Sequence, residues 1–135
     1  MITLFTDASC SREHNLCVWA FTEHPKKKNR IYRWGYLRNI DSAQGELFAC
    51  LNALNFALSL NRHEPIRLET DYVPLHLLYR QRDRYRKHRN SQLFELIAQY
   101  LRHNPIALCP IRDGNWAHTI AYTHLIDLIH SNQPL

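Results

Sequence analysis

Hydrophobic and polar positions alternate through the first part of the chain. The alternation and the β-branched residues at 2–6 predict a strand, and the apolar segment 16–22 predicts a second one. A polar turn at 24–30 separates the second segment from 31–38, which is rich in aromatic residues and predicts a third strand. Because the connections are short, we expect these strands to form an antiparallel meander.

The period of the hydrophobic pattern then becomes that of a helix. Four leucines recur on one stripe of this helix: Leu47, Leu51, Leu54 and Leu58. Asp41 followed by Gln44 suits a capping box at its start. Gly45, an unfavourable residue inside a helix, indicates that another backbone or a ligand approaches closely there. Pro65 and the polar residues before it end the helix.

The remaining segments complete an α/β order. Residues 66–71 alternate again, and 105–111 form a short apolar run, so we expect a fourth and a fifth strand. Residues 73–78 are expected to form a short helix or a turn, and helical spacing predicts helices at 91–102 and 115–129. A helix between the third and fourth strands makes the fourth parallel to a strand of the meander. We therefore expect one domain over 1–135, with a mixed sheet and helices on both faces.

Composition places the chain among folded domains. Hydrophobic residues make up 45% and charged residues 21%, which excludes disorder as the main state. The longest apolar segment, 47–60, is interrupted by polar residues and falls short of the ~18 residues of a membrane helix. The N-terminal residues lack the charged region and cleavage site of a secretory signal. We therefore expect a cytoplasmic protein without a membrane partner.

Four cysteines are too sparse for a disulfide scaffold in a chain of this length, and their spacing matches no zinc motif. In the cytoplasm thiols stay reduced. We therefore expect four free cysteines: Cys10, Cys17, Cys50 and Cys109.

The net charge of +5 favours a polyanionic partner. The segment 80–89 is strongly one-sided in charge, and it is either a solvated helix face or a contact to backbone phosphates; we favour the second. Its basic residues are Arg80, Arg82, Arg84, Arg86, Lys87 and Arg89. We interpret Lys26–Lys28 as a solubilising hairpin tip. We assign Trp19, Trp34 and the tyrosines of the third strand to packing.

Three acidic residues are predicted to converge. Asp7 and Asp71 lie at the carboxyl ends of the first and fourth strands, which are neighbours in the expected sheet. Glu46 lies in the first turn of the crossover helix, which begins beside the same sheet. Three carboxylates repel one another unless a cation lies among them, and oxygen ligands select Mg²⁺ or Mn²⁺. Two such ions drive in-line phosphodiester hydrolysis.

The segments that contain these residues resemble the acidic motifs of the type 1 ribonuclease H family. The matching segments are Thr-Asp-Ala-Ser at 6–9, Gln-Gly-Glu at 44–46, Glu-Thr-Asp at 69–71 and Gly-Asn-Trp-Ala-His at 114–118. They occur in the family's order and on the same kinds of element. The resemblance covers almost the entire chain and implies the family's five-stranded mixed sheet, made of an antiparallel meander and two parallel strands.

The resemblance implies a metal-dependent endonuclease that cuts the RNA strand of an RNA–DNA hybrid and leaves a 5′-phosphate. Asp7 would bridge two Mg²⁺ or Mn²⁺ ions, and Glu46 and Asp71 would bind one each or orient bound waters. The fourth family carboxylate falls on His118, which favours Mn²⁺ more than a carboxylate does. Asp113 is the alternative occupant of that fourth position.

The resemblance also implies a substrate surface, at which this sequence departs from the family. Ser9 and Cys10 follow Asp7 and are expected to contact substrate, as is the segment 80–89, which occupies the place of the family's basic handle. Ser42 and Ala43, just before Gln44, replace asparagines that read the 2′-OH, and Tyr72 replaces a serine. Two alternatives therefore stay open: a nuclease for structured or duplex DNA, and a non-catalytic nucleic-acid-binding module. We expect a monomer.

Overall fold

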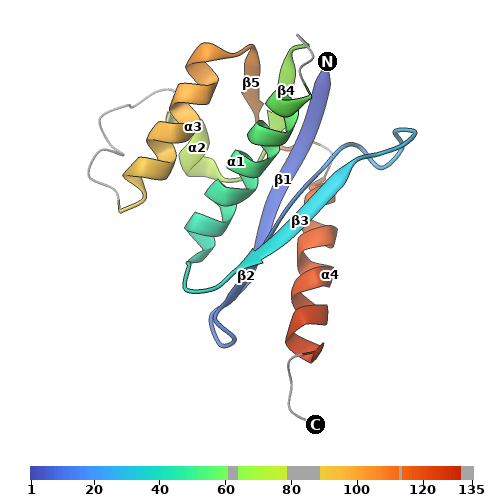
Figure 1. Ribbon diagram of the computed structural model, residues 1–135, viewed down its shortest axis with the longest axis vertical. Coiled ribbons are helices and arrows are strands. Elements are labelled where there is room, and N and C mark those ends of the chain that lie inside the picture. The colour runs from blue at the N-terminus through green and yellow to red at the C-terminus, as the bar shows by residue number, and fades with distance from the viewer. Residues whose placement is uncertain (61–63, 79–88, 113, 132–135) are drawn as a thin grey trace.

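The computed structural model describes residues 1–60, 64–78, 89–112 and 114–131 (Figure 1). The elements follow the predicted order of three strands, a helix, a strand, two helices, a strand and a helix. They are β1 (Ile2–Ser11), β2 (Leu16–Thr22), β3 (Tyr32–Leu37), α1 (Ser42–Ser59), β4 (Ile66–Glu69), α2 (Val73–Leu78), α3 (Ser91–His103), β5 (Ile106–Cys109) and α4 (Trp116–Ser131).

The five strands form one mixed sheet in the order β3-β2-β1-β4-β5. β1 pairs with β2, and β2 with β3, in antiparallel fashion, so the predicted meander is confirmed. β4 lies parallel to β1 on one side and to β5 on the other. The parallel pairing of β1 with β4 ends at Phe5 opposite Glu69. This register determines where the chain can bring polar groups from β1 and β4 together.

Helices cover both faces of the sheet, as predicted (Figure 1). Alternate residues of β1 point to opposite faces. Leu4 packs in the larger core with the apolar residues of α1 and α3, and Phe5 packs in a second core with Ala117, Ala121 and Leu125 of α4. None of the helices in the described ranges has the length and hydrophobicity needed to cross a bilayer.

The capping box predicted for α1 is present. The Asp41 carboxylate accepts a hydrogen bond from the Gln44 backbone N–H at 2.8 Å, and the Gln44 side-chain oxygen accepts from the Asp41 N–H at 3.0 Å. Because the helix begins at Ser42, Glu46 lies in its second turn, not in its first. The prediction that Glu46 lies in the first turn of the helix is therefore wrong.

Gly45 allows α1 to lie directly on the hairpin of β1 and β2. A Cβ atom at this position would lie 3.1 Å from the Cβ of Ala8 and 3.2 Å from the Sγ of Cys10. The close approach that the helical glycine indicated is present, and it is made by side chains of the β1–β2 hairpin. It places the next residue, Glu46, beside β1.

The prediction that all cysteines are free is wrong for two of them. Cys10 and Cys17 form a disulfide between β1 and β2. The antiparallel register sets the two residues directly opposite each other, with their Cα atoms 4.0 Å apart. Cys50 and Cys109 are free thiols. The tight turn between the two strands brings the pair together in a way that sequence spacing alone does not reveal.

The assignment of the β3 tyrosines to packing is also wrong. Tyr32 is 48% exposed and Tyr36 is 53% exposed. β3 is an edge strand, so its side chains have a neighbouring strand on one side only. Trp19 and Trp34 are partly buried and pack against the two cores, as expected.

Candidate metal and catalytic site

Three carboxylates from three different elements meet at one place. Asp7 comes from β1, Glu46 from α1, and Asp71 from the residues that follow β4. One oxygen atom of each lies within 4.8 Å of the corresponding atoms of the other two. The convergence expected from the sequence is therefore present in the structure.

The sheet register explains how Asp7 and Asp71 come to face each other. Each lies two residues beyond the last parallel pair, Phe5 opposite Glu69. β1 does not end at Asp7 as predicted, because it continues to Ser11 through its pairing with β2. Asp7 therefore sits inside a strand that is held on the β2 side, while Asp71 leaves the sheet and is exposed.

Burial makes the ionised forms of two of these acids unfavourable. Burial, together with the neighbouring charge of Asp7, raises the pKa of Glu46 to about 9. Burial also raises the pKa of Asp7, and the hydrogen bond from His118 opposes that rise. Two adjacent carboxylates in a low-dielectric environment retain their protons more strongly than exposed ones do.

Glu46, a member of the cluster, has one carboxylate oxygen without a hydrogen-bond partner. Its Oε1 accepts a hydrogen bond from the Ala8 N–H at 3.3 Å. Its Oε2 is buried and has no hydrogen-bond partner. A buried carboxylate oxygen without a partner is costly, and a cation shared with Asp7 and Asp71 would satisfy it. The donor set consists of oxygen atoms, which suits Mg²⁺ or Mn²⁺.

His118 lies next to this cluster, in the first turn of α4. Its Nδ1 is 2.8 Å from Oδ2 of Asp7, and its side chain is 62% exposed. The group of three that could hold an ion consists of Asp7, Glu46 and Asp71, so His118 contacts that group through Asp7. Asp113, the alternative for the fourth position, lies outside the described residues.

Asn115 connects the cluster to α4, and the sequence interpretation gave it no role. Its Nδ2 donates to the Thr6 carbonyl at 3.1 Å and to Oδ2 of Asp71 at 3.3 Å. Its Oδ1 accepts from the Ala117 N–H at 3.1 Å, which caps α4. The Gly-Asn dipeptide before the last helix marked this position, but its partners are visible only in three dimensions.

A polar groove of about 820 Å³ lies beside the first turn of α1. It is lined by Cys10, Ser11, Arg12, Asn15, Asn39, Ile40, Asp41, Ser42, Gln44 and Arg89. Cys10, Ser42, Gln44 and Arg89 were predicted to contact nucleic acid, and the groove brings them together. Arg12, Asn15 and Asn39 were not singled out, because the two turns that hold them meet only in the folded chain.

The two asparagines join the turns at the mouth of the groove. The Asn15 side chain donates to Oδ1 of Asn39 at 2.7 Å, and the Asn39 N–H donates to Oδ1 of Asn15 at 3.0 Å. Both residues have positive φ, 50° and 60°, a conformation that asparagine tolerates better than most residues. Arg89 forms an ion pair with Asp41, the cap of α1.

Other predicted substrate contacts are not placed in this groove. Ser9 and Tyr72 are half-buried and are not among its lining residues. Burial raises the pKa of the Tyr72 hydroxyl. Most of the predicted basic run lies outside the described residues, namely Arg80, Arg82, Arg84, Arg86 and Lys87.

Comparison with known proteins finds likeness in structure and none in sequence. The chain matches no protein-family model, and it matches no curated protein. The structure resembles LC11-RNase H1, solved in complex with an RNA/DNA hybrid, with a TM-score of 0.77 and 13% identity over 96% of this chain and 99% of that one.

Two further solved structures are similar. RNase H1 from the halophilic archaeon Halobacterium salinarum NRC-1 has a TM-score of 0.74 and 12% identity, over 93% of this chain and 98% of that one. LC9-RNase H1, described as a type 1 RNase H with the type 2 active-site motif, has a TM-score of 0.65 and 14% identity, over 90% and 70%. The sheet order, the covering helices and these likenesses agree, so this chain has the fold of the type 1 ribonucleases H.

Proposed function

We propose that the chain is a divergent type 1 ribonuclease H, an endonuclease that hydrolyses the RNA strand of RNA–DNA hybrids by a two-metal-ion mechanism. The convergence of Asp7, Glu46 and Asp71 around the unpaired Oε2 of Glu46 carries this proposal. The polar groove beside α1 and the likeness to a ribonuclease H bound to a hybrid support the choice of substrate.

In this proposal Asp7, Glu46 and Asp71 would hold the cations. Bound Mg²⁺ or Mn²⁺ supplies the positive charge that activates a water molecule and stabilises the leaving 3′ oxygen. The orphaned buried oxygen of Glu46 fits this occupancy, because a cation would remove both its missing contact and the mutual repulsion of the acids.

The neighbouring side chains position the acids. Asn115 ties Asp71 to the Thr6 carbonyl, so an exposed carboxylate keeps its place beside a buried one. His118 holds Oδ2 of Asp7 and takes the fourth position of the site. The cap that Asn115 provides for α4 keeps His118 in the same rigid unit.

The groove supplies contacts to the nucleic-acid backbone. Arg12 and Arg89 carry positive charge at its walls, and the amides and hydroxyls of Asn15, Asn39 and Ser42 offer hydrogen bonds. Contacts of this kind fix the position of a duplex without reading its sequence.

A cleavage panel tests the function. The chain is incubated with matched RNA–DNA hybrid, duplex DNA, duplex RNA and a DNA junction, each with Mg²⁺ and with Mn²⁺. We expect cleavage of the RNA strand of the hybrid, with 5′-phosphate ends, and no cleavage by Asp7→Asn. Asp127→Asn, which changes an exposed aspartate of α4, is the matched control and keeps wild-type activity.

The same panel distinguishes a second candidate, a nuclease for structured or duplex DNA. Ser42 favours that candidate, because it is exposed at the start of α1 where the resemblance places an asparagine that reads the 2′-OH. Preferential cleavage of the DNA substrates would show that DNA, and not the RNA–DNA hybrid, is the substrate. Binding without cleavage in either cation would instead identify a non-catalytic binding module.

A further inference from the structure

β3 carries a row of aromatic residues on the face of the sheet that α4 covers. Tyr32, Trp34 and Tyr36 occupy alternate positions of this edge strand and therefore point to one side of the sheet. That side faces α4, since Trp34 packs in the core that α4 covers. Gly35, which points the other way, lies against the ring of Trp19. Tyr32 and Tyr36, which are about half exposed, are thus available to a partner.

α4 forms the second wall of a groove at the Tyr32 end of this row. The groove is lined by Arg30, Tyr32, Thr119, Ile120, Thr123 and His124. The rings of His124 and Trp34 stack at 3.9 Å with 12° between their planes. This stack fixes α4 beside β3 and separates the two exposed tyrosines.

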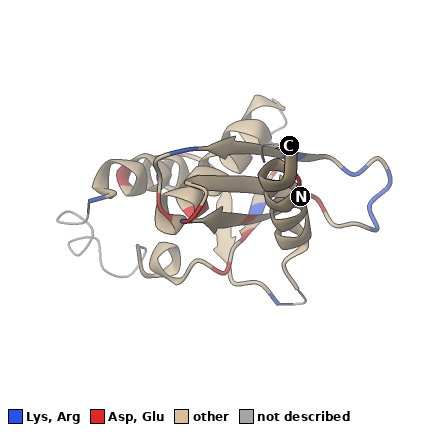
Figure 2. Cartoon of the chain, turned by 90° about the horizontal axis from the view of Figure 1, so that it is seen from below, with Lys and Arg blue, Asp and Glu red and all other residues tan. Residues whose placement is uncertain are grey.

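Positive charge surrounds the aromatic row. The guanidinium carbon of Arg30 lies 5.2 Å from the centre of the Tyr32 ring. The Nε of Arg30 donates to Oγ1 of Thr22 at 2.8 Å. Figure 2 shows the lysines of the projecting β2–β3 connection at the end of this edge. Lys27 pairs with Glu23, while Lys26 and Lys28 are exposed.

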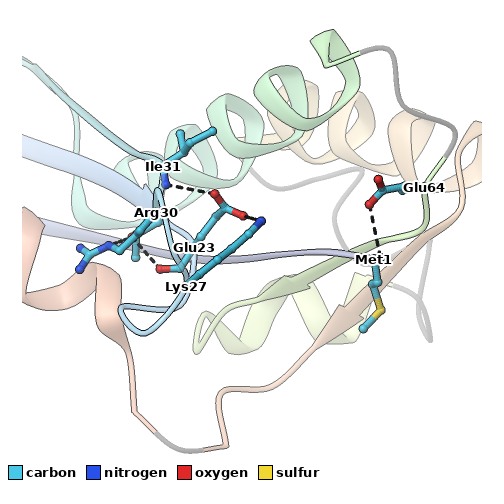
Figure 3. Close-up of polar contacts among 7 residues, drawn as sticks. Met1, Glu23, Lys27, Arg30, Ile31 and Glu64 are labelled. Atoms are coloured by element: carbon cyan, nitrogen blue, oxygen red, sulfur yellow. Dashed lines mark hydrogen bonds and ion pairs between the residues drawn. The ribbon is translucent and has the colours of Figure 1, made fainter.

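Acidic charge on this side is small among the described residues. Asp127 is exposed on α4, one turn beyond Thr123. Glu23 is buried and held by Lys27 and by the N–H of Ile31 (Figure 3). The edge is therefore suited to a polyanionic partner, and not to a basic partner or a neutral apolar one.

The spacing of the rings selects the form of the polyanion. Alternate residues of a strand are about 6.7 Å apart, whereas the stacked nucleotides of one duplex strand rise about 3.4 Å each. Trp34 is already stacked on His124, so the two rings open to a base are Tyr32 and Tyr36, four residues or about 13 Å apart along the strand. This spacing suits bases that are drawn apart, as in an extended single strand. Aromatic platforms flanked by arginine bind such strands without reading their sequence.

We propose that Arg30, Tyr32, Trp34, Tyr36 and His124, here called the β3 edge, bind a single-stranded segment of nucleic acid. The β3 edge lies on a different flank of α4 from His118, since His118 faces Asp7 of β1 and His124 faces Trp34 of β3. It is therefore a second binding surface, for an overhang or a displaced strand next to the region in the catalytic site. The proposal goes beyond the proposed function and does not depend on cleavage.

Fluorescence anisotropy with a labelled oligo(dT) and a labelled oligo(rU) of about 12 nucleotides tests this surface. The full chain is used with a chelator, so that cleavage cannot occur. We expect binding by the wild type and by Asp7→Asn. The double variant Tyr32→Ala/Tyr36→Ala should weaken binding roughly 30-fold or more, because each of the two lost base stacks is expected to contribute at least a factor of about five.

Matched variants show whether the rings are responsible. Tyr32→Phe/Tyr36→Phe keeps the rings and should bind like the wild type. Arg102→Ala removes an exposed arginine of α3, away from this edge, and should leave affinity unchanged. An unchanged affinity of the double alanine variant, verified as folded by circular dichroism, would overturn the proposal. So would the absence of binding by the wild type, as expected if the edge docks a protein instead.

Hybrid cleavage and single-strand binding by the β3 edge can be tested independently of each other. The double alanine variant should cut a blunt-ended hybrid at the wild-type rate and lose rate only on a hybrid with a single-stranded overhang. If the wild type cuts no hybrid, the proposed activity is wrong, and the anisotropy measurement still decides the β3 edge.

Discussion

Glu46 is buried at a position where its ionised form is unfavourable. Its Oε2 is buried without a partner, and burial raises its pKa to about 9. In the unfolded chain a glutamate loses its proton near pH 4.3. Between these two values the folded chain binds more protons than the unfolded chain, so stability falls as pH rises from about 4.5 to 9.

Glu46→Gln should therefore stabilise the cation-free protein at pH 8 and have little effect at pH 5. We expect a gain of about 1–3 kcal/mol in the free energy of unfolding at pH 8, because the variant has no buried carboxyl group that must take up a proton on folding. Urea denaturation with a chelator at both values measures this. Glu95→Gln, at an exposed glutamate of α3, is the control and should show no such pH dependence. An equal effect of Glu46→Gln at both pH values would contradict the interpretation.

His118 is expected to set the preference among cations. His118→Asp places a carboxylate beside Asp7, and oxygen ligands suit Mg²⁺ better than an imidazole does. The ratio of cleavage rates in Mg²⁺ and in Mn²⁺ should rise roughly tenfold, the size typical of changes next to a metal ligand. A folded variant whose ratio does not change would show that His118 acts only on Asp7 and not on the cation.

At the scale of elements, the Cys10–Cys17 disulfide links β1 to β2 under the first turns of α1. Closing a loop of this length is expected to stabilise the fold by about 2–3 kcal/mol, through the entropy of the unfolded chain. Reduction should lower the free energy of unfolding by that amount, as measured by urea denaturation with and without dithiothreitol.

Two variants separate this bond from the other thiols. The free energy of unfolding of Cys10→Ser/Cys17→Ser should be the same with and without the reductant. Cys109→Ser removes a half-buried free thiol and should lose as much stability on reduction as the wild type does. If the wild type does not respond either, the two thiols are not joined in solution.

Periodicity predicted the elements well and their pairing details poorly. The leucine stripe and the Asp41–Gln44 box predicted α1, since both are local properties of the chain. The Cys10–Cys17 bond depends on the register of β1 against β2, and no local pattern encodes that register. The position of Asp7 inside β1 depends in the same way on the length of β2 that pairs with it.

For the whole molecule, the three acids were predictable because each ends or follows a recognisable local pattern. Asn115 and the groove residues Arg12, Asn15 and Asn39 were not, because their partners come from turns distant in sequence. The aromatic residues of β3 were assigned to packing because an edge strand and a central strand have the same periodicity. Solvent exposure separates the two only after the sheet order is known.

The net charge of +5 predicts binding to nucleic acid that depends strongly on salt. With Asp7→Asn, which prevents cleavage, the logarithm of the affinity for hybrid should fall linearly with the logarithm of salt concentration. Adding Arg12→Ala or Arg89→Ala should reduce the slope by about 1 each. Arg102→Ala is the control. A slope that neither Arg12→Ala nor Arg89→Ala changes would show that the groove does not contact the nucleic acid.

The short contact between Gly45 and Ala8 has two structural consequences. The absent side chain at this position lets α1 rest on Ala8, and the same contact sets the separation between Glu46 and its neighbour in β1, Asp7. A methyl group added there would lift the helix and widen the spacing of the acids in a single step. The packing of α1 on β1 and the spacing of the three acids are thus not independent of each other.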